Sequence, residues 1–210
     1  MYTLYYAPGA ASLVVHWLLI EIGARHELRK LDLAAREHKR PEYLALNPAG
    51  RVPTLLIHGE PMTEAAAMVM HLADAHPNFG LAPTPGTVER ARYYQWIVFL
   101  ANTLQPAFRD WYYPEEAAGP EHADAVRTRA AETIDAAWDQ VEAHLAKRGP
   151  YLLGPSVSAA DFLLTMLMRW SRNLPRQATG WPQLGALAQR MKARPGFRLL
   201  YEREGLQEWA

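Results

Sequence analysis

The stretch from Asn47 to Asp74 reads NPAGRVPTLLIHGEPMTEAAAMVMHLAD and predicts a loop, a strand, a tight hairpin, a short second strand and a helix. Its pivot is Val52-Pro53, which directly precedes the apolar run Thr54–Ile57. A proline is tolerated just before a strand, and an X-Pro bond in a tight turn is a candidate cis peptide. We therefore expect the backbone of Val52 to face outward, where an extended ligand can exchange main-chain hydrogen bonds with it.

The far end of this stretch predicts a site for a zwitterionic group. Thr63-Glu64-Ala65-Ala66 opens a helix, and the free N–H groups and dipole at a helix N-terminus attract a carboxylate. Glu64 lies at the same position and can accept a hydrogen bond from an ammonium group. The alternative interpretation is purely structural: a hairpin begun by a proline and followed by a helix.

The residues before this stretch predict a complete α/β unit. We expect alternating elements in the order strand, helix, strand and weak helix, with the bounds Tyr2–Tyr6, Ser12–Ala24, His26–Leu33 and Ala34–Leu46. With the hairpin and helix that follow, this is the thioredoxin-like βαβ-ββα order. A right-handed crossover makes the first two strands parallel and brings the hairpin alongside them.

A break in composition separates the two halves of the chain. The segment from His76 to Gly86 holds three prolines and two glycines and cannot continue a helix. We expect a domain at residues 1–76, a linker at 77–86 and an all-helical bundle of about five helices at 87–210. Its helical segments are predicted at Thr87–Phe108, Glu121–Lys147, Ser158–Arg172 and Trp181–Arg194, the last stopped by Pro195-Gly196 and followed by a tail.

The composition argues against several classes of protein. Of 210 residues half are hydrophobic, 22 are basic, 22 are acidic and none is cysteine. Balanced charge gives no broad field for nucleic acid or an anionic membrane, and no apolar run approaches the ~20 residues of a membrane span. We expect a cytoplasmic protein without a metal site, because the histidines lack metal-ligand spacing. Any thiol chemistry depends on a thiol in the ligand.

The junction of the first strand and helix predicts an anion site. In Pro8-Gly9-Ala10-Ala11-Ser12 the N–H groups of Ala11 and Ser12 and the Ser12 hydroxyl can converge on one anion. The alternative is that Ser12 is the N-cap of the helix. In the second half, Ser158-Ala159-Ala160-Asp161 is a capping box with a structural role.

These motifs together resemble the glutathione transferases, in which a valine-cis-proline pair and a Glu-Ser pair hold glutathione. The resemblance extends from Tyr5-Tyr6-Ala7-Pro8-Gly9 through the VPTL motif to Ser158–Asp161, and it looks closest to the bacterial beta class. It implies glutathione as co-substrate, no metal, and a homodimer that packs the N-terminal domain of one subunit against the bundle of the other. Met68, Val69 and Leu72 are a candidate stripe for that contact.

The resemblance also implies how the glutathione thiol is activated. Ser12 is the first candidate for the partner of the thiolate, and Tyr6 is the rival, because many members of the family use an N-terminal tyrosine. The chain departs from the beta class at three places: Ala11 replaces its cysteine, Gln105-Pro106 replaces its His-Lys pair, and Ala65 replaces the serine after Glu64. These departures favour simple thiolate stabilisation over chemistry through a protein cysteine.

The expected substrate contacts fall in both halves of the chain. Residues expected to bind glutathione are Arg36 (with His38 or Lys39 as substitutes) for its glycine carboxylate, together with Arg51, Val52, Pro53, Glu64 and Ala65. The bundle is expected to supply a pocket for a small hydrophobic electrophile, formed by Asn102, Phe108, Trp111, Tyr112 and Arg169.

Three functions remain open from the sequence. The first is a transferase that adds the glutathione thiolate to an apolar electrophile. The second is a protein of the same fold that holds glutathione or a hydrophobic ligand without turnover, which the loss of the beta-class polar groups favours. The third is a protein-interaction module, which Val52-Pro53 and Glu64 argue against.

Overall fold

The computed structural model describes residues 1–209 and divides into two compact units. The N-terminal unit comprises Met1–Ala82 together with the segment that begins at Lys192, and the helical unit comprises Pro83–Met191. The segment that begins at Lys192 therefore belongs to the N-terminal unit and not, as the sequence suggests, to the second domain. The predicted linker at residues 77–86 contains the boundary between the two units.

A mixed four-stranded sheet forms the centre of the N-terminal unit. Its strands are β1 (Tyr2–Tyr6), β2 (His26–Lys30), β3 (Thr54–Ile57) and β4 (Glu60–Met62), in the spatial order β2-β1-β3-β4. β1 pairs with β2 in parallel and with β3 antiparallel, and β3 pairs with β4 antiparallel. This topology confirms the thioredoxin-like order that the sequence predicts.

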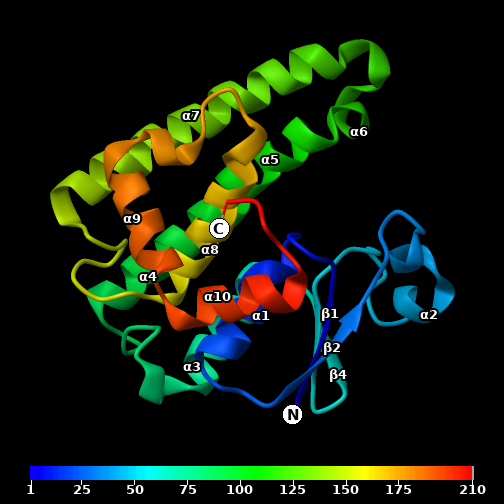
Figure 1. Cartoon of the computed structure of the whole chain (residues 1–210), viewed down its shortest axis with the longest axis horizontal. Coiled ribbons are helices and arrows are strands. Elements are labelled where there is room, and N and C mark those ends of the chain that lie inside the picture. Colours follow the sequence, from blue (N-terminus) through cyan, green and yellow to red (C-terminus); the bar gives the residue numbers. More distant parts are fainter. Residues whose placement is uncertain (210) are drawn as a thin grey trace. The chain divides into compact units, whose positions relative to one another are not determined.

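Three helices pack together in this unit: α1 (Ser12–Glu21), α3 (Ala65–Ala75) and α10 (Pro195–Glu204). α1 contacts β1, α3 and α10, and Figure 1 shows α1 and α10 side by side. Met68, Val69 and Leu72 of α3 are fully buried within this unit. Their expected role as a stripe facing another subunit is therefore wrong.

The segment predicted as a tail after Pro195-Gly196 contains a helix, α10. Proline is favoured at the first position of a helix, so Pro195 begins α10 where we expected only a stop. α10 approaches α1 closely at Gly196, where an added Cβ would lie 2.6 Å from a carboxylate oxygen of Glu21 and would displace the end of that side chain. Arg194, just before α10, pairs with Glu21. The contact between the first and last helices is therefore tightly packed.

The weak helix expected at Ala34–Leu46 is two short elements. A 3-10 turn η1 (Glu37–Lys39) precedes α2 (Pro41–Leu44). Pro41 explains the break, because a proline in a helix interior removes a hydrogen bond but is tolerated at its first turn.

The helical unit is built from α4 (Val88–Phe99), α5 (Gln105–Tyr112), α6 (Pro114–Ala118), α7 (Ala123–Arg148), α8 (Ala159–Trp170) and α9 (Pro182–Lys192). A π-helical segment, η3 (Leu100–Leu104), joins α4 to α5 within the helix predicted at Thr87–Phe108. Short 3-10 turns lie in this unit at η4 (Pro120–His122), η5 (Ser171–Asn173) and η6 (Ala178–Gly180), and one more, η2 (Pro77–Phe79), lies near the end of the first part of the N-terminal unit. No helix within residues 1–209 is long and apolar enough to cross a membrane.

The centre of the helical unit is α8, which is almost wholly buried. The predicted capping box is present: Ser158 and Asp161 bond reciprocally at the start of α8. Thr87 also caps α4 as expected, because its hydroxyl accepts a hydrogen bond from the Arg90 N–H at 3.2 Å.

Candidate functional site

The loop before β3 has the geometry that the sequence predicts for ligand binding. The Val52-Pro53 peptide is cis, as expected. Neither the N–H nor the C=O of Val52 takes part in a backbone hydrogen bond within residues 1–209. Val52 therefore presents a main-chain donor and acceptor that an extended peptide can use.

The start of α3 offers unpaired N–H groups. Among the described residues, the first backbone hydrogen bond of α3 runs from Met68 N–H to Glu64 C=O, and the N–H groups of Ala65, Ala66 and Ala67 have no backbone acceptor. Glu64 is exposed and has φ +68°, which is uncommon for a residue other than glycine. Such strained backbone concentrates at functional sites. This geometry suits a group that carries both a carboxylate and an ammonium.

Ser12 does not present its hydroxyl to a ligand in this structure. Its side chain is fully buried, and Oγ donates to the Ala7 C=O at 3.0 Å and accepts from the Ala7 N–H at 3.2 Å. The N-cap of α1 is Ala11, so the alternative role of Ser12 as N-cap is also wrong. These two bonds fix the end of β1 to the start of α1, which corrects the expectation that the hydroxyl faces the anion.

The N-terminus of α1 nevertheless retains free donors. In the described part of the chain, the N–H groups of Ala11 and Ser12 donate to no backbone oxygen. Because the helix dipole adds positive potential at the same place, these two N–H groups can stabilise an anion without a side chain.

The Tyr6 hydroxyl, at the end of β1, is free to bind a ligand. Its ring packs against His16, with centroids 5.8 Å apart, while Tyr5 packs on the opposite side against Tyr43. The Tyr6 hydroxyl forms no hydrogen bond with any group among residues 1–209. It is not one of the buried polar atoms that lack a partner, so its oxygen is in contact with solvent. Burial of the ring, with the carboxylate of Glu204, raises the Tyr6 pKa. Tyr6 thus stays protonated at neutral pH and can donate to an anion.

Two of the basic residues expected to bind a carboxylate keep that ability. Arg36 and Arg51 form no ion pair with any described residue, and Arg51 is exposed. Lys39 is committed elsewhere, because its Nζ donates to the carbonyls of Ala49 at 3.3 Å and Gly50 at 2.8 Å. His38 has a lowered pKa, caused by burial and by the charges of Lys39 and Arg36. It is therefore neutral at physiological pH, which leaves Arg36 and Arg51 as the stronger candidates.

A buried carboxylate that the sequence analysis missed supports the loop between β1 and α1. Glu204 of α10 accepts a hydrogen bond from the Gly9 N–H at 2.8 Å and lies 2.8 Å from Nδ1 of His16. Both side chains are completely shielded from solvent. No local pattern marks Glu204, since its partners lie 195 and 188 residues away in the chain.

The pocket residues predicted in the helical unit are not brought together on one surface. Phe108 is fully buried and contacts the rings of Trp138 and Trp170, and Arg169 is 3% exposed. Both therefore belong to the packed interior, which corrects their placement on a pocket wall. Asn102 is exposed on η3, and the Tyr112 hydroxyl donates to the Trp170 carbonyl at 2.6 Å.

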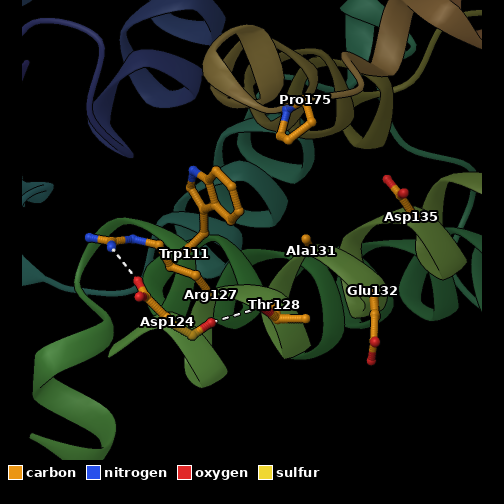
Figure 2. Close-up of a pocket in the computed structure, with 8 residues that line it drawn as sticks. All are labelled: Trp111, Asp124, Arg127, Thr128, Ala131, Glu132, Asp135 and Pro175. Atoms are coloured by element: carbon orange, nitrogen blue, oxygen red, sulfur yellow. Dashed lines mark hydrogen bonds and ion pairs between the residues drawn. The ribbon is translucent and has the colours of Figure 1, made fainter. Parts of the chain in front are cut away.

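Trp111 does line a pocket, of about 480 Å³, within the helical unit. Figure 2 shows its indole above one face of α7 and directed toward the side where Pro175 lies. Asp124 pairs with Arg127 at 3.5 Å beside it. The lining residues are Trp111, Asp124, Arg127, Thr128, Ala131, Glu132, Asp135 and Pro175. Within residues 1–209 no group of three or more His, Cys, Asp or Glu side chains is placed to hold a metal ion.

Comparison with known proteins gives the same family for both halves. The family model of the glutathione S-transferase N-terminal domain matches residues 1–74, and that of the C-terminal domain matches residues 124–209. The chain is 33% identical to the glutathione S-transferase GST-4.5 of Xanthomonas campestris pv. campestris, over 97% of this chain and 98% of that protein.

Solved structures agree with this match. A glutathione transferase homologue from Sulfitobacter with bound glutathione is 29% identical, with a TM-score of 0.90 and coverage of 99% of both chains. The bacterial beta class glutathione S-transferase of Sphingomonas chungbukensis is 31% identical, with a TM-score of 0.85 and coverage of 98% of this chain and 100% of that chain. The chain belongs to the glutathione S-transferase family of enzymes.

Proposed function

We propose that this transferase holds glutathione along Val52 and the start of α3, stabilises its thiolate at the start of α1, and transfers it to a small apolar electrophile. The observation that carries the proposal is the pair of unpaired N–H groups at Ala11 and Ser12, at the N-terminus of a ten-residue helix. Bound glutathione in the Sulfitobacter homologue supports the choice of co-substrate.

Thiolate stabilisation sets the energy that the site must supply. A free thiol titrates near ~8.5, so keeping it mostly ionised at neutral pH requires a shift of roughly two units, or about 3 kcal/mol. Hydrogen bonds to a charged group contribute about 1.5–3 kcal/mol each. Two helix N–H groups and the phenol of Tyr6 are together sufficient. The thiol proton leaves to solvent, and the Tyr6 proton stays on its oxygen.

The transfer step then needs only proximity and an electrophile. The thiolate sulfur forms a bond to the electrophilic carbon, and the leaving group departs with the electron pair of the bond that breaks. Glutathione is anchored by its carboxylates, for which we propose the α3 N–H groups at one end and Arg36 and Arg51 at the other. Glu64 receives the ammonium of the γ-glutamyl group.

The first test is substitution of Tyr6 by phenylalanine. Thiolate absorbance of bound glutathione, followed from about pH 5 to about pH 9, should show a midpoint below neutrality in wild type. Loss of one charge-assisted hydrogen bond should raise this midpoint by about one unit in Tyr6→Phe and lower kcat/KM with an activated aryl halide about tenfold. In Ser12→Ala the same midpoint should stay close to that of wild type, because its hydroxyl is bonded to Ala7.

The same titration separates the enzyme from its alternative. The alternative function, a non-catalytic glutathione or hydrophobic-ligand binding protein, is favoured by the replacement of the beta-class cysteine and His-Lys pair by Ala11, Gln105 and Pro106. A wild-type protein that binds glutathione without a depressed midpoint would support this alternative. A midpoint that shifts in Ser12→Ala and not in Tyr6→Phe would return the thiolate role to Ser12.

We also propose a homodimer, with exposed apolar residues of α4 in the contact. Tyr94 and Val98 lie one turn apart and are 42% and 50% exposed, and α3 leaves Ala66 and Met70 partly exposed. Single apolar residues are normal on a surface, but a stripe at helical spacing is typical of a contact face. Light scattering should give the mass of a dimer for wild type and of a monomer for Val98→Glu. An unchanged dimer in Val98→Glu would exclude this face.

A further inference from the structure

The carbonyl of Arg51 is held on the inner side of the loop by two side chains. The Tyr43 hydroxyl donates to it at 2.6 Å, and Nδ2 of Asn47 donates to it at 2.8 Å. A carbonyl oxygen has two lone pairs, so these two donors occupy its full acceptor capacity. The orientation of this one peptide group is therefore fixed from within the protein.

The fixed carbonyl determines where Val52 points its N–H. The C=O of Arg51 and the N–H of Val52 belong to the same peptide group, and this group is trans. In a planar trans peptide the two bonds point in opposite directions. Because the carbonyl is directed at Tyr43 and Asn47, the N–H of Val52 is directed away from them. It has no backbone acceptor within residues 1–209.

The two donors are themselves held in a buried network without an unpaired atom. Tyr43 and Asn47 are 4% and 3% exposed, and Thr54, the first residue of β3, is fully buried. The Tyr43 hydrogen is used on Arg51, so the Thr54 hydroxyl donates to the Tyr43 oxygen at 2.8 Å. Thr54 in turn accepts from Nδ2 of Asn47 at 3.2 Å, and Oδ1 of Asn47 accepts from the Ala49 N–H at 3.1 Å. A fully satisfied buried network of this kind favours one geometry.

We propose that Tyr43 and Asn47 are positioning residues for glutathione: they never touch it, but they aim the Val52 N–H at its peptide carbonyl. This inference rests on the proposed binding of glutathione at Val52. Preorganisation of the donor lowers the cost of binding, because the loop need not be ordered when the ligand arrives. Without the two hydrogen bonds to the Arg51 carbonyl, the Arg51–Val52 peptide group can rotate, and the Val52 N–H then bonds to water part of the time.

The experiment compares Tyr43→Phe with Tyr5→Phe by titration calorimetry with S-methylglutathione, which has no ionisable thiol. Tyr43→Phe keeps the ring and removes one donor to Arg51. Tyr5 packs on the ring of Tyr43, with centroids 5.6 Å apart. Tyr5→Phe is therefore a matched control, which removes a neighbouring hydroxyl but keeps both hydrogen bonds to the Arg51 carbonyl. We expect Kd to rise about three- to tenfold in Tyr43→Phe, the effect of one hydrogen bond, and to stay at the wild-type value in Tyr5→Phe.

Two further readings separate positioning from a general loss of stability. In Tyr43→Phe, KM for glutathione should rise in proportion to Kd, while kcat and the thiolate midpoint at saturating glutathione stay unchanged. Hydrogen exchange of the Val52 amide in the complex should be faster than in wild type. Asn47→Asp, which turns an acceptor toward the Arg51 carbonyl, should weaken binding further; if that variant does not fold, Tyr43→Phe alone decides.

The outcomes are distinct. If Tyr43→Phe binds S-methylglutathione with the wild-type Kd, this inference is overturned and the proposed function stands. The same conclusion follows if Tyr5→Phe weakens binding as much as Tyr43→Phe does. Absence of binding to wild type would overturn the proposed function, and this inference with it.

Discussion

Replacing Glu204 with alanine should lower the free energy of unfolding by about 3 kcal/mol, because the buried Nδ1 of His16 and the partly buried N–H of Gly9 lose their acceptor together, and a buried group costs about 1–3 kcal/mol when left unpaired. The Gly9 N–H and Nδ1 of His16 both lie 2.8 Å from this carboxylate. The side chains of His16 and Glu204 are both fully shielded from solvent in the wild-type protein. The measurement is urea unfolding of the full chain, followed by far-ultraviolet circular dichroism.

Glu202→Ala is the matched control for this prediction. Glu202 lies two residues earlier on the same helix and is exposed, so its loss should change stability by less than about 0.5 kcal/mol. If Glu202→Ala and Glu204→Ala change the free energy of unfolding equally, the change comes from the helix propensity of α10 and not from the buried contact of Glu204. A specific effect of Glu204→Ala should also raise KM for glutathione, because Gly9 belongs to the loop that leads to Ala11.

The parts of this fold that follow from sequence are those fixed by neighbours in the chain. Val52-Pro53 before an apolar run predicted both the turn and its cis bond, and Ser158 with Asp161 predicted a capping box, because each of these features is complete within a few residues. The βαβ-ββα order also follows, since strand and helix periods alternate clearly before residue 76.

The misses concern residues whose role depends on distant contacts. Ser12 is an exception, because its partner Ala7 is only five residues away, but a serine at a strand-to-helix junction is equally compatible with an anion site, an N-cap or a hydrogen bond to the preceding strand end, and only the folded backbone decides between them. Phe108 is an aromatic residue of the kind that lines apolar pockets, but it is buried in contact with the rings of Trp138 and Trp170. The sequence predicts a helix stop at Pro195, because no local pattern indicates that a further helix packs against α1. Packing partners of this kind are set by tertiary structure and leave no periodic signal.

The second large loss of stability is expected when Asp161, the acidic residue of the capping box, is replaced by asparagine. Oδ1 of Asp161 accepts from the Leu152 N–H at 2.9 Å, and its Oδ2 accepts from both the N–H and the hydroxyl of Ser158 at 2.8 Å. Asp161→Asn keeps the shape but turns an NH2 group toward donors that need an acceptor. With the site fully buried, the expected loss is about 2–4 kcal/mol in the free energy of unfolding. Asp124→Asn, in the exposed first turn of α7, should change stability by less than about 0.5 kcal/mol.

The size of this loss should depend on pH in a direction that the burial of Asp161 sets. Burial raises its pKa to about 6, against an ordinary value of 3.8. The pKa of Asp161 is therefore higher in the folded chain than in the unfolded chain, so protonation of this carboxyl stabilises the fold. This contribution to the free energy of unfolding is complete below about pH 4 and is lost as the pH rises through about 6. The asparagine variant has no such proton, so the stability difference between wild type and Asp161→Asn should be larger at about pH 5 than at about pH 8. A difference that grows with pH would instead mean that the three donors outweigh burial and hold the carboxylate ionised in the folded chain.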